Sequence, residues 1–252
     1  MTLRIALLFL LTGLLAGCVS SGSGNPLKTR EGRDEARDAY VQLGIGYLQQ
    51  GEPARAKAPL REALELDSRS ADAHAALALV FQAEMENELA DKHFREALAS
   101  RSDARILNNY GSFLYEQKRY QEALQRFTAA SADTLYPERA RVFQNLGMTT
   151  LQLGQPEAAE QHFTRALRLD SRQPGALLEL AQLAYADNQF VPARRYYEAF
   201  SRLSEQNARS LLLGIRLANV HEDRDKAASL GLQLKRLYPG TPEYQHYLSE
   251  QR

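Results

Sequence analysis

The 252-residue sequence holds a single cysteine, Cys18, and has no net charge, because 31 lysines and arginines balance 31 aspartates and glutamates. One cysteine excludes an intrachain disulfide and any metal site built from several thiolates. The balanced charge removes the main electrostatic support for nucleic-acid binding, so we expect no nucleic-acid partner short of a local basic patch. With 44% hydrophobic and 25% charged residues, the composition is that of a folded chain of one or two domains.

The motifs of common enzyme classes are also absent. The sequence contains no P-loop, no GxGxxG turn and no GxSxG motif, and Gly44 and Gly46 fall inside a predicted helix rather than after a strand. No two histidines have the i, i+4 spacing of a zinc-binding HExxH helix; the five are His74, His93, His162, His221 and His246. We therefore expect no enzyme activity, no cofactor or metal, and no small-molecule substrate.

The first 17 residues have the pattern of an export signal. One positive side chain, Arg4, precedes a charge-free apolar run of 13 residues from Ile5 to Gly17. Such a run is too short to span a bilayer, which needs about 20 residues. Residues 1–17 are therefore predicted to be a cleaved signal peptide.

The run ends in Leu15-Ala16-Gly17-Cys18, which resembles the lipobox of bacterial lipoproteins. The resemblance implies that Cys18 is lipidated and becomes the first residue after cleavage, and acyl chains on it would anchor the protein to a membrane. Val19 stands where inner-membrane lipoproteins often have aspartate, which implies an outer-membrane location facing the periplasm. The alternative is an ordinary signal peptide with an incidental cysteine.

Residues 18–36 are predicted to be the lipidated cysteine followed by a flexible tether. From Val19 to Glu35 the sequence is small, polar and rich in glycine and serine, which favours coil. Seventeen coil residues span roughly 20–25 Å. The folded part would therefore stand off the membrane surface.

From residue 37 onward, one template recurs about every 34 residues. Counted from the start of each repeat, position 20 is alanine in all six copies, position 8 is small in five and position 24 is large in five. The sixth copy has Ile215 at position 8 and Gly231 at position 24, and is interpreted as degenerate. The predicted repeats are 37–70, 71–103, 104–139, 140–173, 174–207 and 208–241, with a capping segment at 242–252.

Small residues at positions 8 and 20 let two antiparallel helices approach closely, while the large residue at position 24 fills the space beside them. Short turns with glycine or asparagine, as at Gly51 and Asn188, separate the two helices. This pattern resembles the tetratricopeptide repeat (TPR). The resemblance implies an all-α fold, a right-handed TPR superhelix (α-solenoid) of six helix–turn–helix repeats.

In such a superhelix the first helix of each repeat lines the concave face, so partner-binding side chains are expected there. Val41, Ile45 and Leu48 form an apolar stripe on the first repeat, and Leu79 of the second repeat extends it. One interpretation is an open groove that accepts an amphipathic helix or an apolar peptide. The alternative is packing against the next repeat.

In repeats three and four the same face is polar. The predicted partner-binding residues there are Asn108, Tyr115, Arg141 and Gln144. Their side chains are suited to hydrogen-bonding a peptide backbone. For the asparagines, hydrogen bonding between repeats is an equal alternative.

The chain combines a lipobox, a short tether and TPRs that continue to its last residues. It also contains two local motifs. One is Asn108 to Leu114 followed by Arg119-Tyr120, and the other is Tyr40-x-x-Leu43-Gly44-x-x-Tyr47-Leu48. Together they resemble the PilF/PilW family of type IV pilus biogenesis lipoproteins. The resemblance implies a pilotin, a non-enzymatic outer-membrane lipoprotein that binds the pilus secretin subunit and promotes its localisation and multimer assembly. Alternatives of similar design are scaffolds for outer-membrane β-barrel assembly and adaptors for cell-wall hydrolases.

Overall fold

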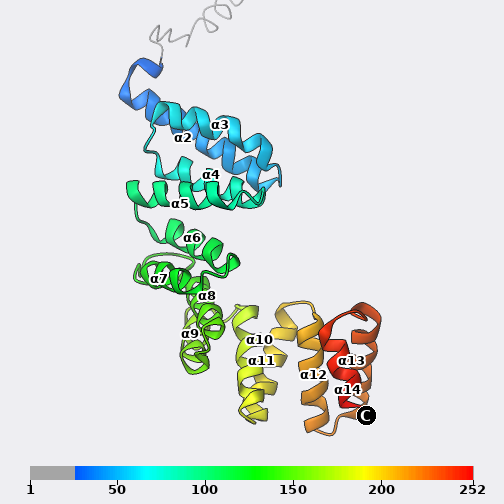
Figure 1. Ribbon diagram of the computed structural model, residues 1–252. Coiled ribbons are helices and arrows are strands. Elements are labelled where there is room, and N and C mark those ends of the chain that lie inside the picture. Colours follow the sequence, from blue (N-terminus) through cyan, green and yellow to red (C-terminus); the bar gives the residue numbers. More distant parts are fainter. Residues whose placement is uncertain (1–25, 252) are drawn as a thin grey trace, which may run out of the picture.

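The computed structural model describes residues 26–251, in which one short 3₁₀ helix and thirteen α-helices occur and no strand. The elements are η1 (Pro26–Lys28), α2 (Arg30–Gln49), α3 (Pro53–Leu66), α4 (Ala71–Ala83), α5 (Asn87–Ser100), α6 (Ala104–Glu116), α7 (Tyr120–Ser131), α8 (Arg139–Gln152), α9 (Pro156–Leu169), α10 (Pro174–Ala186), α11 (Phe190–Leu203), α12 (Ala208–Val220), α13 (Arg224–Leu237) and α14 (Pro242–Glu250). Consecutive helices pair, and the pairs stack in chain order into an open, bent solenoid (Figure 1). The predicted all-α solenoid is confirmed.

The first helix starts earlier than the sequence predicts. Repeats two, three, five and six begin at the first residue of a helix and repeat four begins one residue inside α8, but α2 begins at Arg30. The predicted flexible tether is therefore wrong for residues 30–36, which are helical. The Thr29 hydroxyl accepts a hydrogen bond from the Gly32 amide at 3.0 Å and caps the helix, and Glu31 lies in its first turn.

Within each repeat, the two helices approach through a small residue. A Cβ atom at Gly44, Gly111 or Gly147 would lie 2.5–2.7 Å from Leu60, Phe127 or Phe163, respectively. Each of these pairs joins repeat position 8 to position 24. The alternation of small and large residues in the sequence is therefore a direct contact between the two helices.

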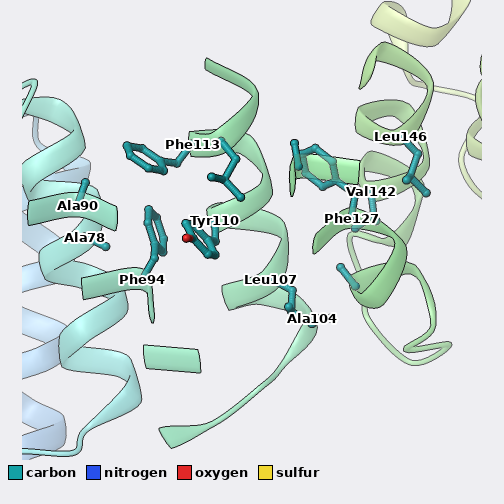
Figure 2. Close-up of a cluster of buried hydrophobic side chains, with 13 residues drawn as sticks. Ala78, Ala90, Phe94, Ala104, Leu107, Tyr110, Phe113, Phe127, Val142 and Leu146 are labelled. Atoms are coloured by element: carbon teal, nitrogen blue, oxygen red, sulfur yellow. The ribbon is translucent and has the colours of Figure 1, made fainter. Parts of the chain in front are cut away.

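Between repeats, the first helix packs on the second helix of the repeat before it. Phe94 of α5 stacks on Tyr110 of α6 with ring centroids 5.1 Å apart and lies 5.5 Å from Phe113 (Figure 2). Phe127 of α7 joins the same cluster with Val142 of α8. Position 3 is fully buried in repeats two to six, where it is Ala73, Ile106, Val142, Ala176 and Ser210.

One residue with positive φ, at repeat position 15, forms the turn inside every repeat. Gly51, Gly154 and Asn188 occupy it in repeats one, four and five, where the sequence predicts glycine or asparagine. The remaining repeats place ordinary side chains there, at Met85, Lys118 and Glu222. A side chain with a Cβ atom is strained in this left-handed conformation.

The sixth repeat, interpreted from sequence as degenerate, exchanges its small and large positions. Ile215 is the large residue at position 8, and Gly231 is the small residue at position 24. The space above Gly231 is taken by the Tyr247 ring of α14, which covers the end of the solenoid. An ion pair between Arg216 and Glu250 also holds α14 in place.

None of the helices within residues 26–251 is both long and apolar enough to cross a membrane. The predicted signal peptide, residues 1–17, and the predicted lipidation site Cys18 lie outside the described residues.

Candidate partner-binding groove

A groove of about 420 Å³ runs along the first helices of repeats three to six. Helix α6 contacts α8, α8 contacts α10, and α10 contacts α12. The lining residues are Ser112, Tyr115, Glu116, Phe127, Gln144, Asn145, Met148, Gly175, Leu178, Glu179 and Arg209. All except Phe127 lie on the first helices, the elements from which the sequence predicts partner contacts.

An ion pair between repeats five and six forms one wall of the groove. The Arg209 guanidinium of α12 donates to both carboxylate oxygens of Glu179 in α10, at 3.0 and 3.2 Å, and to the Gln182 side chain at 2.7 Å. The Glu179 side chain is only 8% exposed, whereas that of Arg209 is 47% exposed. Arg209 therefore neutralises a buried carboxylate while its own head group stays accessible from the groove.

Gln144 connects repeats four and five at the groove floor. Its Oε1 accepts a hydrogen bond from the Ala176 amide at 3.1 Å, in the first turn of α10, whose own N-cap side chain does not cap the helix. Gly175 allows this approach, since a Cβ atom there would lie 2.7 Å from the same oxygen. Gln144 therefore lines the groove and also caps the next repeat, and its binding of a partner stays a prediction.

Tyr115 of α6 lines the same groove as the ion pair. Burial raises the pKa of its hydroxyl, and the nearby Tyr120 and Glu179 raise it further. The hydroxyl therefore stays protonated at neutral pH and can donate a hydrogen bond. Together with the half-buried Met148 and the buried Leu178, its ring gives the groove apolar surface beside the polar groups of the lining.

Two polar residues predicted for this site lie elsewhere. Asn108 is 2% exposed and its Oδ1 accepts a hydrogen bond from Asn145 Nδ2 at 3.1 Å, so the alternative of a bond between repeats holds. Arg141 is exposed, pairs with Glu138 at 2.9 Å and lines a separate groove beside the α7–α8 loop. Partner binding by Asn108 is therefore a wrong prediction, and partner binding by Arg141 stays a prediction, on a surface other than this groove.

The apolar stripe predicted on the first repeat is mostly packing. Val41 is 3% exposed and lies against Ala63 and Ala73, so it cannot contact a partner and that prediction is wrong. Ile45 and Leu48 are half-buried against α3 and α4, and partner binding by their accessible edges stays a prediction. Leu79 packs on the cluster of repeats two to four. The alternative of packing against the next repeat accounts for the stripe.

The sequence reasoning missed the part of the groove formed by repeats five and six, including Leu178, Glu179 and Arg209. They occupy positions 5, 6 and 2 of repeats five and six, next to or equal to positions considered in the earlier repeats. Extending the same periodicity to the last two repeats would have found them. Among the described residues no group of three or more His, Cys, Asp or Glu side chains could hold a metal ion, and the groove offers binding groups for a peptide.

Comparison with known proteins agrees with this architecture. Residues 102–172 match one tetratricopeptide repeat family, and residues 41–84 and 145–208 match another. The chain is 64% identical over 251 residues to the type IV pilus assembly protein PilF of Pseudomonas aeruginosa, covering 99% of this chain and 100% of that protein.

Two solved structures are similar over most of their length. That of Pseudomonas aeruginosa PilF has a TM-score of 0.85 at 64% identity, over 87% of this chain and 99% of the other. That of PilW, a widely conserved type IV pilus biogenesis factor, has a TM-score of 0.72 at 30% identity, over 84% and 98%. Given this near-complete similarity in sequence and fold, the chain belongs to the PilF family of type IV pilus assembly proteins.

Proposed function

We propose that the protein is a pilotin, an outer-membrane lipoprotein that binds the type IV pilus secretin subunit and promotes its localisation and multimer assembly without catalysis. The observation that carries this proposal is the groove over repeats three to six, in a chain of a pilus-assembly family. Bonds between repeats, from the Ala176 amide to Gln144 and from Arg209 to Glu179, fix the first helices that line the groove. The groove is therefore preorganised for a protein client.

An extended segment of the client suits this groove best. Met148 and Leu178 offer an apolar floor for one side chain, and the Tyr115 hydroxyl and the Asn145 amide offer hydrogen-bonding groups for a backbone. Two carboxylates, Glu116 and Glu179, against one guanidinium give the lining a net charge of −1. We expect the bound segment to be neutral or weakly basic.

Lipidation of Cys18 is the second part of the proposal and rests on the Leu-Ala-Gly-Cys sequence. Eleven residues separate Cys18 from the first residue of α2. Even at full extension a chain of this length reaches at most about 40 Å. Acyl chains on Cys18 would therefore keep the groove close to the membrane in which the client assembles.

The decisive experiment measures heat-stable secretin multimers in outer-membrane fractions of cells with the gene intact, deleted, or carrying Cys18→Ala. We expect multimers to disappear on deletion and to be depleted or misplaced with Cys18→Ala. A Tyr115→Ala, Met148→Ala double variant should also lose multimers. Met85→Ala is the matched control, because Met85 is exposed on a turn and does not line the groove.

Unaltered multimers in every strain would contradict the proposal. The protein would then be a TPR scaffold for outer-membrane β-barrel assembly or for cell-wall hydrolases. Copurification with barrel-assembly proteins or with a hydrolase would separate those two functions.

A further inference from the structure

The last three repeats carry opposite charge on their two edges. In each helix pair the second helix ends at the edge where the first begins, which we call the loop edge, and the two helices join at the opposite, turn edge. In repeats four to six the loop edge comprises residues 167–173, 201–207 and 235–241, and the turn edge comprises residues 153–159, 187–193 and 221–227. With histidine neutral, the loop edge has five cations against two carboxylates, a net charge of +3, and the turn edge has two cations against five carboxylates, a net charge of −3.

One dipeptide recurs along the loop edge of these repeats. Helices α9, α11 and α13 each end in arginine followed by leucine, at Arg168-Leu169, Arg202-Leu203 and Arg236-Leu237. The three leucines are 42%, 42% and 52% exposed. Each repeat therefore presents a hydrocarbon side chain next to a cation on the same edge.

The cations of this edge are not used inside the protein. The ion pairs of repeats four to six are made by other arginines, namely Arg141, Arg194, Arg209 and Arg216. Five exposed side chains of the loop edge form no hydrogen bond or ion pair with another described residue: Arg168, Arg172, Arg202, Lys235 and Arg236. Asp170 and Glu198 feel the charges of Arg172 and Arg202 but accept side-chain hydrogen bonds from Gln173 and Arg194, respectively.

Helix dipoles do not account for the pattern. A cation in the last turn stabilises a helix, and this would apply equally to the second helices of repeats one to three. Yet α3, α5 and α7 have no basic residue in their last turns. Their loop edge, residues 64–70, 98–103 and 131–139, holds three cations against five carboxylates, a net charge of −2. The basic edge is therefore confined to repeats four to six.

We propose that the loop edge of repeats four to six docks on an anionic phospholipid surface. Each leucine would enter the headgroup region, while the arginine beside it extends to the lipid phosphates. Lysine and arginine side chains near an anionic membrane are attracted to it, and the carboxylate-rich turn edge is repelled. Apolar side chains at three separate helix ends suit a continuous surface better than one peptide segment.

The lipid anchor would bring such a surface within reach, and in this respect the inference rests on the proposed function. Because α2 is a first helix, its start at Arg30 lies on the loop edge of repeat one. The solenoid bends between repeat one and repeat four (Figure 1), and the eleven residues from Cys18 to Arg30 can reach up to about 40 Å. None of the residues that line the inner groove belongs to the basic edge, so docking leaves the groove free for a client.

Vesicle cosedimentation tests the docking with the chain from residue 18 onward, which contains every described helix and carries Cys18→Ser so that no acyl chain contributes. We expect binding to vesicles of equimolar phosphatidylcholine and phosphatidylglycerol, at least about tenfold weaker binding to phosphatidylcholine alone, and loss of the difference at high salt. The triple variant Arg168→Glu, Arg202→Glu, Arg236→Glu should bind the anionic vesicles at least about tenfold more weakly.

The matched control is Lys118→Glu, Arg224→Glu, Lys226→Glu, which makes the same change in net charge at exposed side chains of the turn edge. It should bind the anionic vesicles nearly as well as the unaltered chain. Replacing Leu169, Leu203 and Leu237 together by serine should weaken binding several-fold, because the leucines no longer enter the headgroup region. Circular dichroism checks that each variant is folded.

Failure of the unaltered chain to bind anionic vesicles would overturn the proposal, and so would equal weakening by the two triple glutamate variants. A chain that ignores vesicles, but whose loop-edge variant loses affinity for the secretin subunit, would assign the edge to an acidic segment of the client and would also overturn it. The Tyr115→Ala, Met148→Ala variant, tested for secretin binding without membranes, examines the proposed function separately.

Discussion

The first repeat and repeats three to six use the same positions of their first helices in different ways. At positions 5, 9 and 12 the first repeat carries Val41, Ile45 and Leu48, which pack toward α3 and α4. In repeats three to five these positions include Tyr115, Gln144, Met148 and Leu178, and a groove remains open beside them. The first repeat therefore uses these positions to extend its core, whereas in repeats three to five they line an open groove whose first helices are joined by bonds such as that of Gln144 to the Ala176 amide.

The largest expected effect concerns the ion pair of the groove wall. Arg209→Ala would leave the buried Glu179 carboxylate without its guanidinium, so we expect the free energy of unfolding to fall by about 2–3 kcal/mol. Arg141→Ala removes a pair between exposed side chains and should change it by less than about 0.5 kcal/mol. Urea denaturation of both variants measures the difference, and equal losses would show that Glu179 is not held by Arg209.

A second comparison is between a helical glycine packed against a neighbouring helix and a helical glycine with open space beside it. Gly111→Ala forces a methyl group against Phe127, with a Cβ contact of 2.7 Å, and should cost about 1–3 kcal/mol of stability. Gly46→Ala meets no atom within 4 Å and should gain about 0.5–1 kcal/mol, since alanine favours a helix. Thermal melting at low protein concentration checks both signs. A loss with Gly46→Ala would mean that this face is already covered.

The second repeat should be the part most sensitive to mild acid. Burial lowers the pKa of His93 from 6.5 to about 4, with help from His74 and Lys92, and its Nδ1 lies 2.9 Å from Nδ1 of His74. As the pH falls, His93 becomes protonated near pH 6.5 in the unfolded chain but only near pH 4 in the folded chain. Stability should therefore be full above pH 6.5 and decline below it, by roughly 1–2 kcal/mol once partial exposure is allowed for.

Unfolding midpoints measured between pH 7 and 5 check this prediction. His93→Gln should flatten the profile over that range. Burial also lowers the pKa of His162, so its contribution has the same sign, and His162→Gln serves for comparison. An unchanged slope in His93→Gln would show that other groups control the acid response.

The smallest effect is expected at a turn. Met85 has φ of 62° and its side chain is exposed, so Met85→Gly removes strain without removing packing. We expect a gain of about 0.5–1 kcal/mol in the free energy of unfolding. Gly154→Ala, at the same repeat position, should lose a similar amount. A urea titration in which Met85→Gly loses stability and Gly154→Ala gains it would show that the positive φ at this position is not strained for a side chain.

Most of the fold could be predicted from the sequence because the residues that recur in each repeat are the ones that pack its two helices together. Alanine at position 20 and the exchange of small and large residues at positions 8 and 24 each correspond to one contact between two helices. The early start of α2 was not predictable from the repeat, because it depends on the Thr29 cap outside the template.

The site was harder to predict because exposure depends on which neighbours exist. Val41 and Leu43 lie two residues apart on α2, and the template assigns Leu43 to the core and Val41 to the surface. The reverse is found, since within residues 26–251 no repeat packs over Leu43, whereas the second repeat covers Val41. Asn108 likewise has a polar side chain suited to binding a protein partner, but it accepts its hydrogen bond from Asn145 of the same chain.

The most direct measurement is the affinity of the purified protein for the periplasmic part of the secretin subunit. Three forms are compared: the unaltered chain, the Tyr115→Ala, Met148→Ala double variant, and Ile45→Ala. If the client occupies the groove of repeats three to six, the double variant should bind at least about tenfold more weakly and Ile45→Ala should bind like the unaltered chain. Weaker binding by Ile45→Ala, with the double variant unaffected, would contradict the groove and place the client on the first repeat.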